Sequence, residues 1–171
     1  MPIRFLTIPA VLAAVALAAG CGSSNDTSTS SSTPAKQSSG EGETVKTATV
    51  SKLGRYLIDE DGKALYLFEK DTSPKSTCYG ACAQEWPPVT TSGKPVAEAG
   101  ATGSKLSTSM RTDGTAQVVY DGHPLYYFAG DKAPGDVTGQ GIHNFGGGWY
   151  VVTPAGDEID DDDAPPAPSG Y

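Results

Sequence analysis

The residues best suited to metal or redox chemistry are two cysteines and two histidines, Cys78, Cys82, His123 and His143. Thiolate and imidazole are ligands that zinc and copper prefer, and four of them are enough in number for one site. However, His123 follows a predicted turn and His143 lies in a glycine-rich loop, and their spacing does not bring them together. We therefore treat the two histidines as weak metal candidates and predict no bound metal or cofactor.

The pair Cys78 and Cys82 allows three interpretations. A thiol redox motif normally has two residues between its cysteines, whereas here there are three. Residues four apart in a helix have Cα atoms about 6 Å apart, which is inside the range of disulfides. A structural disulfide is favoured, and a redox-active pair or a set of metal ligands are the alternatives. Covalent haem of the c type is disfavoured because no Cys-x-x-Cys-His occurs.

No pattern of catalytic residues is evident. The sequence lacks a nucleophile elbow with a Ser-His-Asp order. The glycine-rich segments 139–141 and 146–148 are not followed by the lysine and the helix start of a phosphate-binding loop. Glycine at these positions is better explained by a chain that passes close to an aromatic surface. We predict that the protein is not an enzyme.

One stretch of the chain occurs twice. Residues 61–71 return as residues 121–131, an offset of 60, with six of eleven positions identical. Both copies contain the pattern Y-x-[F/W/Y]-x-x-D, and the residues that fit it are Tyr66, Phe68, Asp71, Tyr126, Phe128 and Asp131. The tyrosine and phenylalanine of each copy share one face of a strand, so we expect all four rings to be buried. Each aspartate should end its strand and accept a hydrogen bond from a nearby backbone N–H.

The elements around this stretch also repeat. Segments rich in β-branched and aromatic residues predict three strands in each copy, at 44–50, 55–59 and 65–68, and at 106–111, 117–120 and 125–128. Asp61-Gly62 and Asp121-Gly122 predict type I′ hairpin turns, and a short helical turn should follow Cys78 and stop at Pro87. The predicted fold is mainly β: a duplicated three-stranded antiparallel meander that forms one small domain, with one short helix near Cys-x-x-x-Cys.

The N-terminus resembles a secretory signal, with Arg4 before an apolar run over 5–19. That run is shorter than the roughly 20 apolar residues of a comfortable membrane span. Residues 17–21 resemble a bacterial lipobox, so we predict that Cys21 is lipidated and becomes the mature N-terminus. Two acyl chains anchor a protein stably. We therefore place the protein on the cell membrane, lipid-anchored on the extracytoplasmic side, where disulfides persist.

Composition changes along the chain predict four regions. They are a signal peptide at 1–20, a lipid-anchored disordered Ser/Thr-rich tether at 21–44, a secreted-repeat β domain at 45–159 with repeats at 45–88 and 105–153, and a disordered acidic, proline-rich tail at 160–171. The tether has too few apolar side chains to offset its ordering entropy. The net charge of −8 argues against a nucleic-acid partner.

The repeated motif, the lipobox, the Cys-x-x-x-Cys pair and Trp86-Pro87-Pro88 together resemble the bacterial secreted-repeat lipoproteins that are named for the motif. The resemblance covers roughly residues 45–159. It implies an architecture and a location. The family has no assigned biochemical activity, so the resemblance implies no catalytic residue.

We therefore expect a lipid-anchored extracytoplasmic lipoprotein that acts as a non-enzymatic surface or binding module. The alternative is a redox or electron-transfer accessory that uses Cys78 and Cys82, or a bound metal or haem. The membrane is the one partner that the sequence indicates, through Cys21. A protein partner or a small ligand stays open.

The lipid anchor can be tested by changing Cys21 to Ser. Because the lipid is attached to the cysteine sulfur, Cys21→Ser should release the protein from membranes or block its processing. Cell fractionation and immunoblotting measure both effects. Continued membrane association of a normally cleaved Cys21→Ser protein would contradict the prediction.

Overall fold

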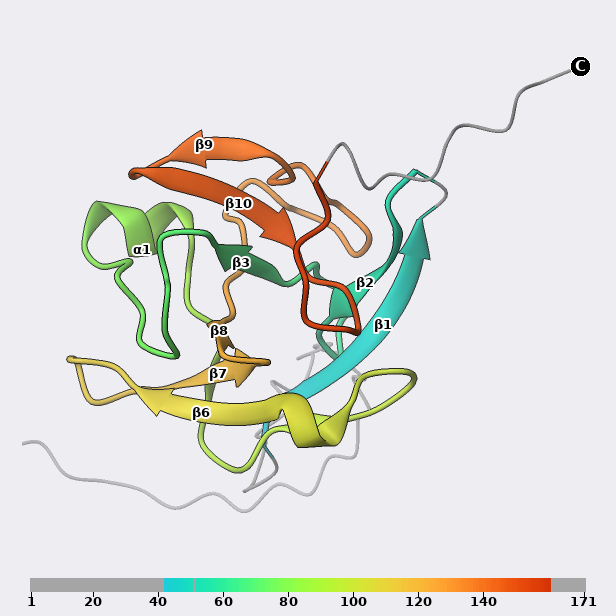
Figure 1. Ribbon diagram of the computed structural model, residues 1–171, viewed down its shortest axis with the longest axis horizontal. Coiled ribbons are helices and arrows are strands. Elements are labelled where there is room, and N and C mark those ends of the chain that lie inside the picture. Colours follow the sequence, from blue (N-terminus) through green and yellow to red (C-terminus); the bar gives the residue numbers. More distant parts are fainter. Residues whose placement is uncertain (1–41, 51, 161–171) are drawn as a thin grey trace, which may run out of the picture. The chain divides into compact units, whose positions relative to one another are not determined.

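The computed structural model describes residues 42–50 and 52–160, which form a mainly-β unit (Figure 1). Cys21, most of the predicted tether and nearly all of the predicted tail lie outside the described residues. The end of the predicted tether does not, because Thr44 already begins the first strand. None of the helices in the described ranges has the length and apolar character that a membrane crossing requires.

The described chain contains ten strands, one short α-helix and one 3-10 turn. These elements are β1 (Thr44–Val50), β2 (Gly54–Ile58), β3 (Tyr66–Phe68), α1 (Ala81–Glu85), β4 (Thr90–Thr91), β5 (Val96–Ala97), η1 (Gly103–Lys105), β6 (Leu106–Met110), β7 (Ala116–Tyr120), β8 (His123–Pro124), β9 (Ile142–Asn144) and β10 (Gly147–Val151). The prediction of a mainly-β fold with one short helix near the cysteines is confirmed. As expected, α1 ends just before Trp86 and Pro87.

The strands form three small sheets, with the orders β2-β1-β5, β3-β10-β9 and β4-β7-β6, and β8 pairs with β7. The first two strands of each predicted meander are antiparallel neighbours, β1 with β2 and β6 with β7. The third strand differs from the prediction in both copies. In the first copy, β3 pairs with β10 of the second copy (Figure 1). In the second copy the strand predicted at 125–128 is wrong: β8 pairs with β7 just before it, and the Tyr126 backbone forms isolated bridges with Tyr66 and Pro88 instead. All three residues of β3 are buried. A strand that is apolar on both faces must be packed against other elements on both sides, and one copy of the repeat alone does not supply enough of them.

The two predicted hairpin turns have different conformations. Asp121 and Gly122 both have positive φ, 48° and 90°, as a type I′ turn requires. In the first copy only Gly62 has a positive φ, so the prediction of a type I′ turn there is wrong. Asp59 accounts for the difference, because its Oδ1 accepts hydrogen bonds from the backbone N–H groups of Asp61 and Lys63 and closes a longer loop.

A stack of four aromatic rings runs through one of the two apolar cores. Its order is Phe68, Trp149, Trp86, Phe128, and neighbouring ring centroids lie 4.0, 4.0 and 4.5 Å apart. The two indole planes are within 3° of parallel. Each phenylalanine therefore packs on the tryptophan of the other copy, and the stack joins the two repeats.

The glycine-rich segments allow the chain to approach this stack. A Cβ on Gly139 would lie 2.8 Å from the Trp86 ring, and one on Gly147 would lie 3.0 Å from the Phe68 ring. Any larger residue would have to push the ring or the backbone away. The expectation that these glycines let the chain pass an aromatic surface is confirmed.

Burial separates the two phenylalanines of the motif. Tyr66, Phe68 and Tyr126 are buried as expected, but Phe128 is only partly buried, so the prediction for that ring was wrong. Phe68→Ala should lower the free energy of unfolding by about 3–5 kcal/mol, the usual cost of truncating a buried phenylalanine. Phe128→Ala should cost clearly less, because part of its ring already faces solvent. Urea unfolding of both variants measures the difference, and equal losses would contradict it.

Candidate functional site

The tyrosine and the aspartate of each motif bond to the other motif and not to their own. The Tyr66 hydroxyl donates to Asp131 Oδ2 at 2.7 Å, and the Tyr126 hydroxyl donates to Asp71 Oδ2 at 2.5 Å. The backbones of Tyr66 and Tyr126 also exchange two hydrogen bonds of 2.9 Å each. Each repeat therefore completes the hydrogen bonding of the other.

The second oxygen of each aspartate binds a threonine that follows it. Asp71 Oδ1 accepts from the backbone N–H and the hydroxyl of Thr77, both at 2.7 Å. Asp131 Oδ1 accepts from the same two groups of Thr138, at 2.9 and 2.6 Å. The prediction of a backbone N–H partner is confirmed for both carboxylates. The threonine hydroxyls were missed, although a Thr six or seven residues after each Asp is visible in the sequence.

The two tyrosines remain protonated in this arrangement. Burial raises the pKa of Tyr66 well above its ordinary value, and the hydrogen bond to Asp131 raises it further. Burial also raises the pKa of Tyr126, and the negative charge of Asp71 adds to the rise. A phenol with such a pKa acts at neutral pH as a fixed hydrogen-bond donor. The motif is therefore suited to holding the two repeats together.

The buried carboxylate of Asp71 is linked to a buried guanidinium. Ser76 Oγ lies 2.6 Å from the Tyr126 hydroxyl and accepts a 2.9 Å bond from Arg111 Nη1. Arg111 Nη2 also donates to the carbonyl of Cys78 at 2.8 Å. A positive charge thus balances Asp71 through two intervening hydroxyls, which lowers the cost of burying both. The second repeat has Val137 directly before its threonine where the first has Ser76, so Asp131 has no such link.

The disulfide Cys78–Cys82 is present, with a Cα–Cα distance of 5.2 Å, and this prediction is confirmed. Cys78 is fully buried and Cys82 is 6% exposed, in the core that contains Trp86. An attacking thiolate must reach a sulfur atom to exchange with a disulfide. The burial of this bond therefore favours a structural crosslink between the segment that follows the first motif and α1.

The two histidines lie on different sheets, His123 in β8 and His143 in β9. His143 Nε2 is 3.0 Å from the Tyr150 hydroxyl, and His123 Nδ1 is buried without a hydrogen-bond partner in the described chain. No group of three or more His, Cys, Asp or Glu within residues 42–50 and 52–160 is placed to hold a metal ion.

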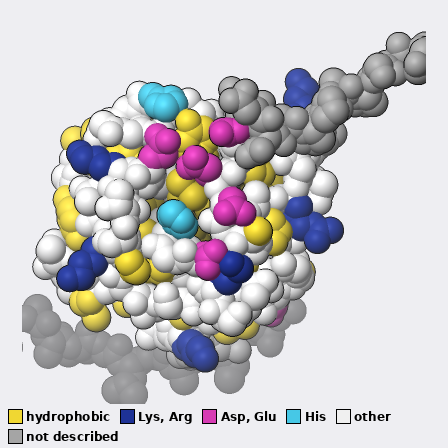
Figure 2. All heavy atoms as spheres, viewed as in Figure 1, with side chains coloured by type: hydrophobic (Ala, Val, Ile, Leu, Met, Phe, Trp, Pro, Cys, Tyr) yellow, Lys and Arg dark blue, Asp and Glu magenta, His cyan; other side chains and the backbone are white. Residues whose placement is uncertain are grey.

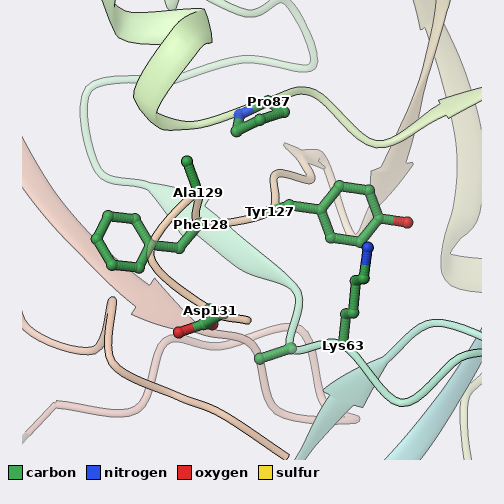
Figure 3. A pocket seen from close by; sticks show the side chains of 7 residues that line it. Lys63, Pro87, Tyr127, Phe128, Ala129 and Asp131 are labelled. Carbon is green, nitrogen blue, oxygen red and sulfur yellow. The ribbon is translucent and has the colours of Figure 1, made fainter. Parts of the chain in front are cut away.

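A pocket of about 290 Å³ opens where the two repeats meet (Figure 3). Its walls are formed by Lys63, Ala64, Pro87, Tyr127, Phe128, Ala129 and Asp131. This volume is at the lower end of the ~300–1,000 Å³ that is usual for ligand sites. Phe128, the last ring of the aromatic stack, is one of the lining residues.

Two smaller residues, one from each repeat, stand beside Phe128 where larger residues stand at the matching positions of the other repeat. The offset of 60 places Ala129 where the first repeat has Glu69. The tryptophans place Pro87 where the second repeat has Tyr150, since Pro87 follows Trp86 as Tyr150 follows Trp149. Phe68 is 1% exposed, whereas Phe128 is only partly buried. This signal was present in the sequence, as a difference between the two copies.

Charged groups lie at two ends of the pocket. The Lys63 ammonium is 5.6 Å from the centroid of the Tyr127 ring, and Figure 3 shows the Asp131 carboxylate pointing away from it. The Tyr127 hydroxyl donates to Glu43 Oε1 at 3.2 Å. Burial raises the pKa of Tyr127, and the negative charges of Glu43 and Asp59 raise it further. The Tyr127 phenol therefore stays neutral.

Acidic residues outnumber basic residues in this chain, and some of them gather on one face of the described unit. Figure 2 shows acidic side chains gathered in the middle of one face, with most of the lysines and arginines towards its rim. The whole chain has 20 Asp and Glu against 12 Lys and Arg. Such a field repels polyanions.

Comparison with known proteins identifies one family. A family model described as a secreted repeat of unknown function matches residues 47–90 and 107–153. The two matches together cover more than half of the 171 residues, and each contains one copy of the motif. Neither a search of curated proteins nor a search of solved structures gives a significant match.

Glu43 gives the domain a testable pH dependence. Burial raises the pKa of this carboxyl, and the nearby charges of Asp59, Glu60 and Asp61 add to the rise, while the Tyr127 bond opposes it. The folded state therefore holds the proton more tightly than the unfolded state. This part of the stability is fully present below the ordinary pKa of Glu and is lost as pH rises through the higher folded value.

Glu43→Gln should keep the acceptor for Tyr127 and remove the charge. The free energy of unfolding of the variant minus that of the parent should be larger at pH 7 than at pH 4. Urea unfolding across that pH range measures this difference. Glu98→Gln at an exposed site is the matched control and should show no such trend. A difference between Glu43→Gln and parent that is constant with pH, or that reverses, would exclude this role.

Proposed function

The chain belongs to the family of secreted repeats of unknown function, and from this premise we propose that it is a lipid-anchored binding module outside the cytoplasm. The module holds a small ligand in the pocket beside Phe128 and does no chemistry on it. The family places the protein in an extracytoplasmic location. The lipid anchor at Cys21 is supported by the lipobox-like residues 17–21.

The observation that carries the proposal is the pocket itself. The hydrogen-bonding groups of the motif tyrosines and aspartates are engaged between the repeats, so the motif accounts for the fold. The pocket lies where the second repeat departs from the first, through Ala129 in place of Glu69. A concave site with apolar walls and a few charged groups is the usual form of a ligand site.

The redox alternative has less support. A thiol-exchange role would need access to Cys78 and Cys82, and both are buried. A metal or haem would give the purified protein a visible absorption band or a stoichiometric metal content. That spectrum is the measurement that would favour the alternative.

Fragment screening by NMR tests the binding module. The mature chain with Cys21→Ser, labelled with ¹⁵N, should show fragment-induced shifts that concentrate at Lys63, Tyr127, Phe128 and Ala129. Ala129→Glu should abolish these shifts, because it puts back the side chain that the first repeat carries. Ala81→Glu, at an exposed site in α1, is the matched control and should leave them unchanged. Hits that map elsewhere, or that survive Ala129→Glu, would refute the proposed site.

A further inference from the structure

We infer that the pocket binds a small organic monoanion, a carboxylate carried on a flat apolar ring; the inference rests on the proposed function and names its ligand class. Three features of the pocket support this class. They are an ammonium group without an ion pair, apolar walls whose neighbouring backbone groups are already bonded, and negative charges that exclude a second anionic group.

The unpaired ammonium belongs to Lys63. Within the described chain its only recorded side-chain contact is with the Tyr127 ring, at 5.6 Å. By contrast, Lys105 pairs with Asp121 at 2.6 Å, and Lys70 donates to the carbonyl of Phe145. A carboxylate on a ligand would supply the charged acceptor that Lys63 lacks, and such charge-assisted bonds are the stronger kind.

The carboxylates near Lys63 are engaged elsewhere. Asp59 Oδ1 accepts bonds from the backbone N–H groups of Asp61 and Lys63, at 2.9 and 2.8 Å. Glu43 Oε1 accepts from the Tyr127 hydroxyl. These bonds hold both carboxylates in place, so neither has to be displaced when a ligand binds to the Lys63 ammonium.

The walls between the charged ends are apolar. Ala64, Pro87, Phe128 and Ala129 line this part of the pocket. The polar backbone groups there are bonded, since Pro87 O accepts from Tyr127 N at 2.8 Å and the Ala129 N–H donates to Glu85 O at 2.8 Å. A ligand body without polar groups therefore fits, because it leaves no polar group unpaired.

A flat ring suits the shape and the size of the site. Pro87 and Ala129 offer it apolar walls. A dry cavity of about 150 Å³ is known to hold benzene. The pocket, at about 290 Å³, has room for one ring and a carboxylate.

The charges around the pocket restrict the ligand to one negative group. Asp131 lies at the end away from Lys63, and its two oxygens already accept three hydrogen bonds. Together with Glu43, Asp59 and the net charge of −8, it disfavours phosphates and dicarboxylates. A cationic ring would meet the Lys63 ammonium. The carboxylate therefore lies at Lys63 and the ring lies against Pro87 and Ala129.

Benzoate is the probe, and its neutral, cationic and ringless counterparts are the controls. ¹⁵N chemical shifts of the mature Cys21→Ser chain are followed in titrations with benzoate, benzyl alcohol, benzylammonium and acetate. Benzoate should bind most tightly, with shifts at Phe128 and Ala129. Lys63→Met should weaken benzoate binding by about tenfold or more, the loss expected for a hydrogen bond between charged groups. Lys70→Met, an exposed lysine of the first motif, should leave it unchanged.

The outcomes separate the ligand class from the proposed function. Tighter binding of benzyl alcohol or benzylammonium in the pocket would overturn the anionic class and leave the binding module standing. Unchanged benzoate affinity in Lys63→Met would also overturn the class. If none of the four probes shifts the signals of the pocket residues, the proposed ligand class is wrong. If the hits of the fragment screen also map outside the pocket, the binding module itself is rejected.

Discussion

The exchange of hydrogen bonds between the two motifs is the constraint on which the rest of the structure depends. A tyrosine in one repeat donates to an aspartate in the other, and the reverse pair does the same. Asp71 is buried, and a buried carboxylate that loses a donor is costly, so Asp71 depends on the tyrosine of the other repeat as well as on its own Thr77. The recurrence of Tyr and Asp at a fixed spacing follows from this requirement, because each copy must offer both a donor and an acceptor.

The same exchange organises the apolar core. The paired backbones of Tyr66 and Tyr126 bring the two motif segments together, and this places each motif phenylalanine on the tryptophan of the other copy. A three-residue strand such as β3 would not be stable alone. The two repeats are therefore one cooperative unit, although the sequence contains two similar segments.

Local features of the fold could be predicted from the sequence, whereas contacts between the repeats could not. The strand pairs β1–β2 and β6–β7, the helix stopped by Pro87 and the disulfide follow from local patterns and short spacings. The pairing of β3 with β10 and the Tyr66–Asp131 bond join residues far apart in the chain, and periodicity carries no information about such partners. The pocket was missed for a related reason, since it arises from a difference between copies at Ala129 and not from any motif.

Double-mutant cycles on the motif test this account of how the repeats are joined. Tyr126→Phe and Asp71→Asn, measured singly and together by urea unfolding, should show a coupling energy of about 0.5–3 kcal/mol, as groups in one hydrogen-bond network do. The control cycle pairs Tyr126→Phe with Asp131→Asn, which lie in the same motif and share no hydrogen bond in the structure, and it should be additive within about 0.5 kcal/mol. Coupling in the control cycle with additivity in the Tyr126–Asp71 cycle would show that each motif is self-contained and would contradict the exchange.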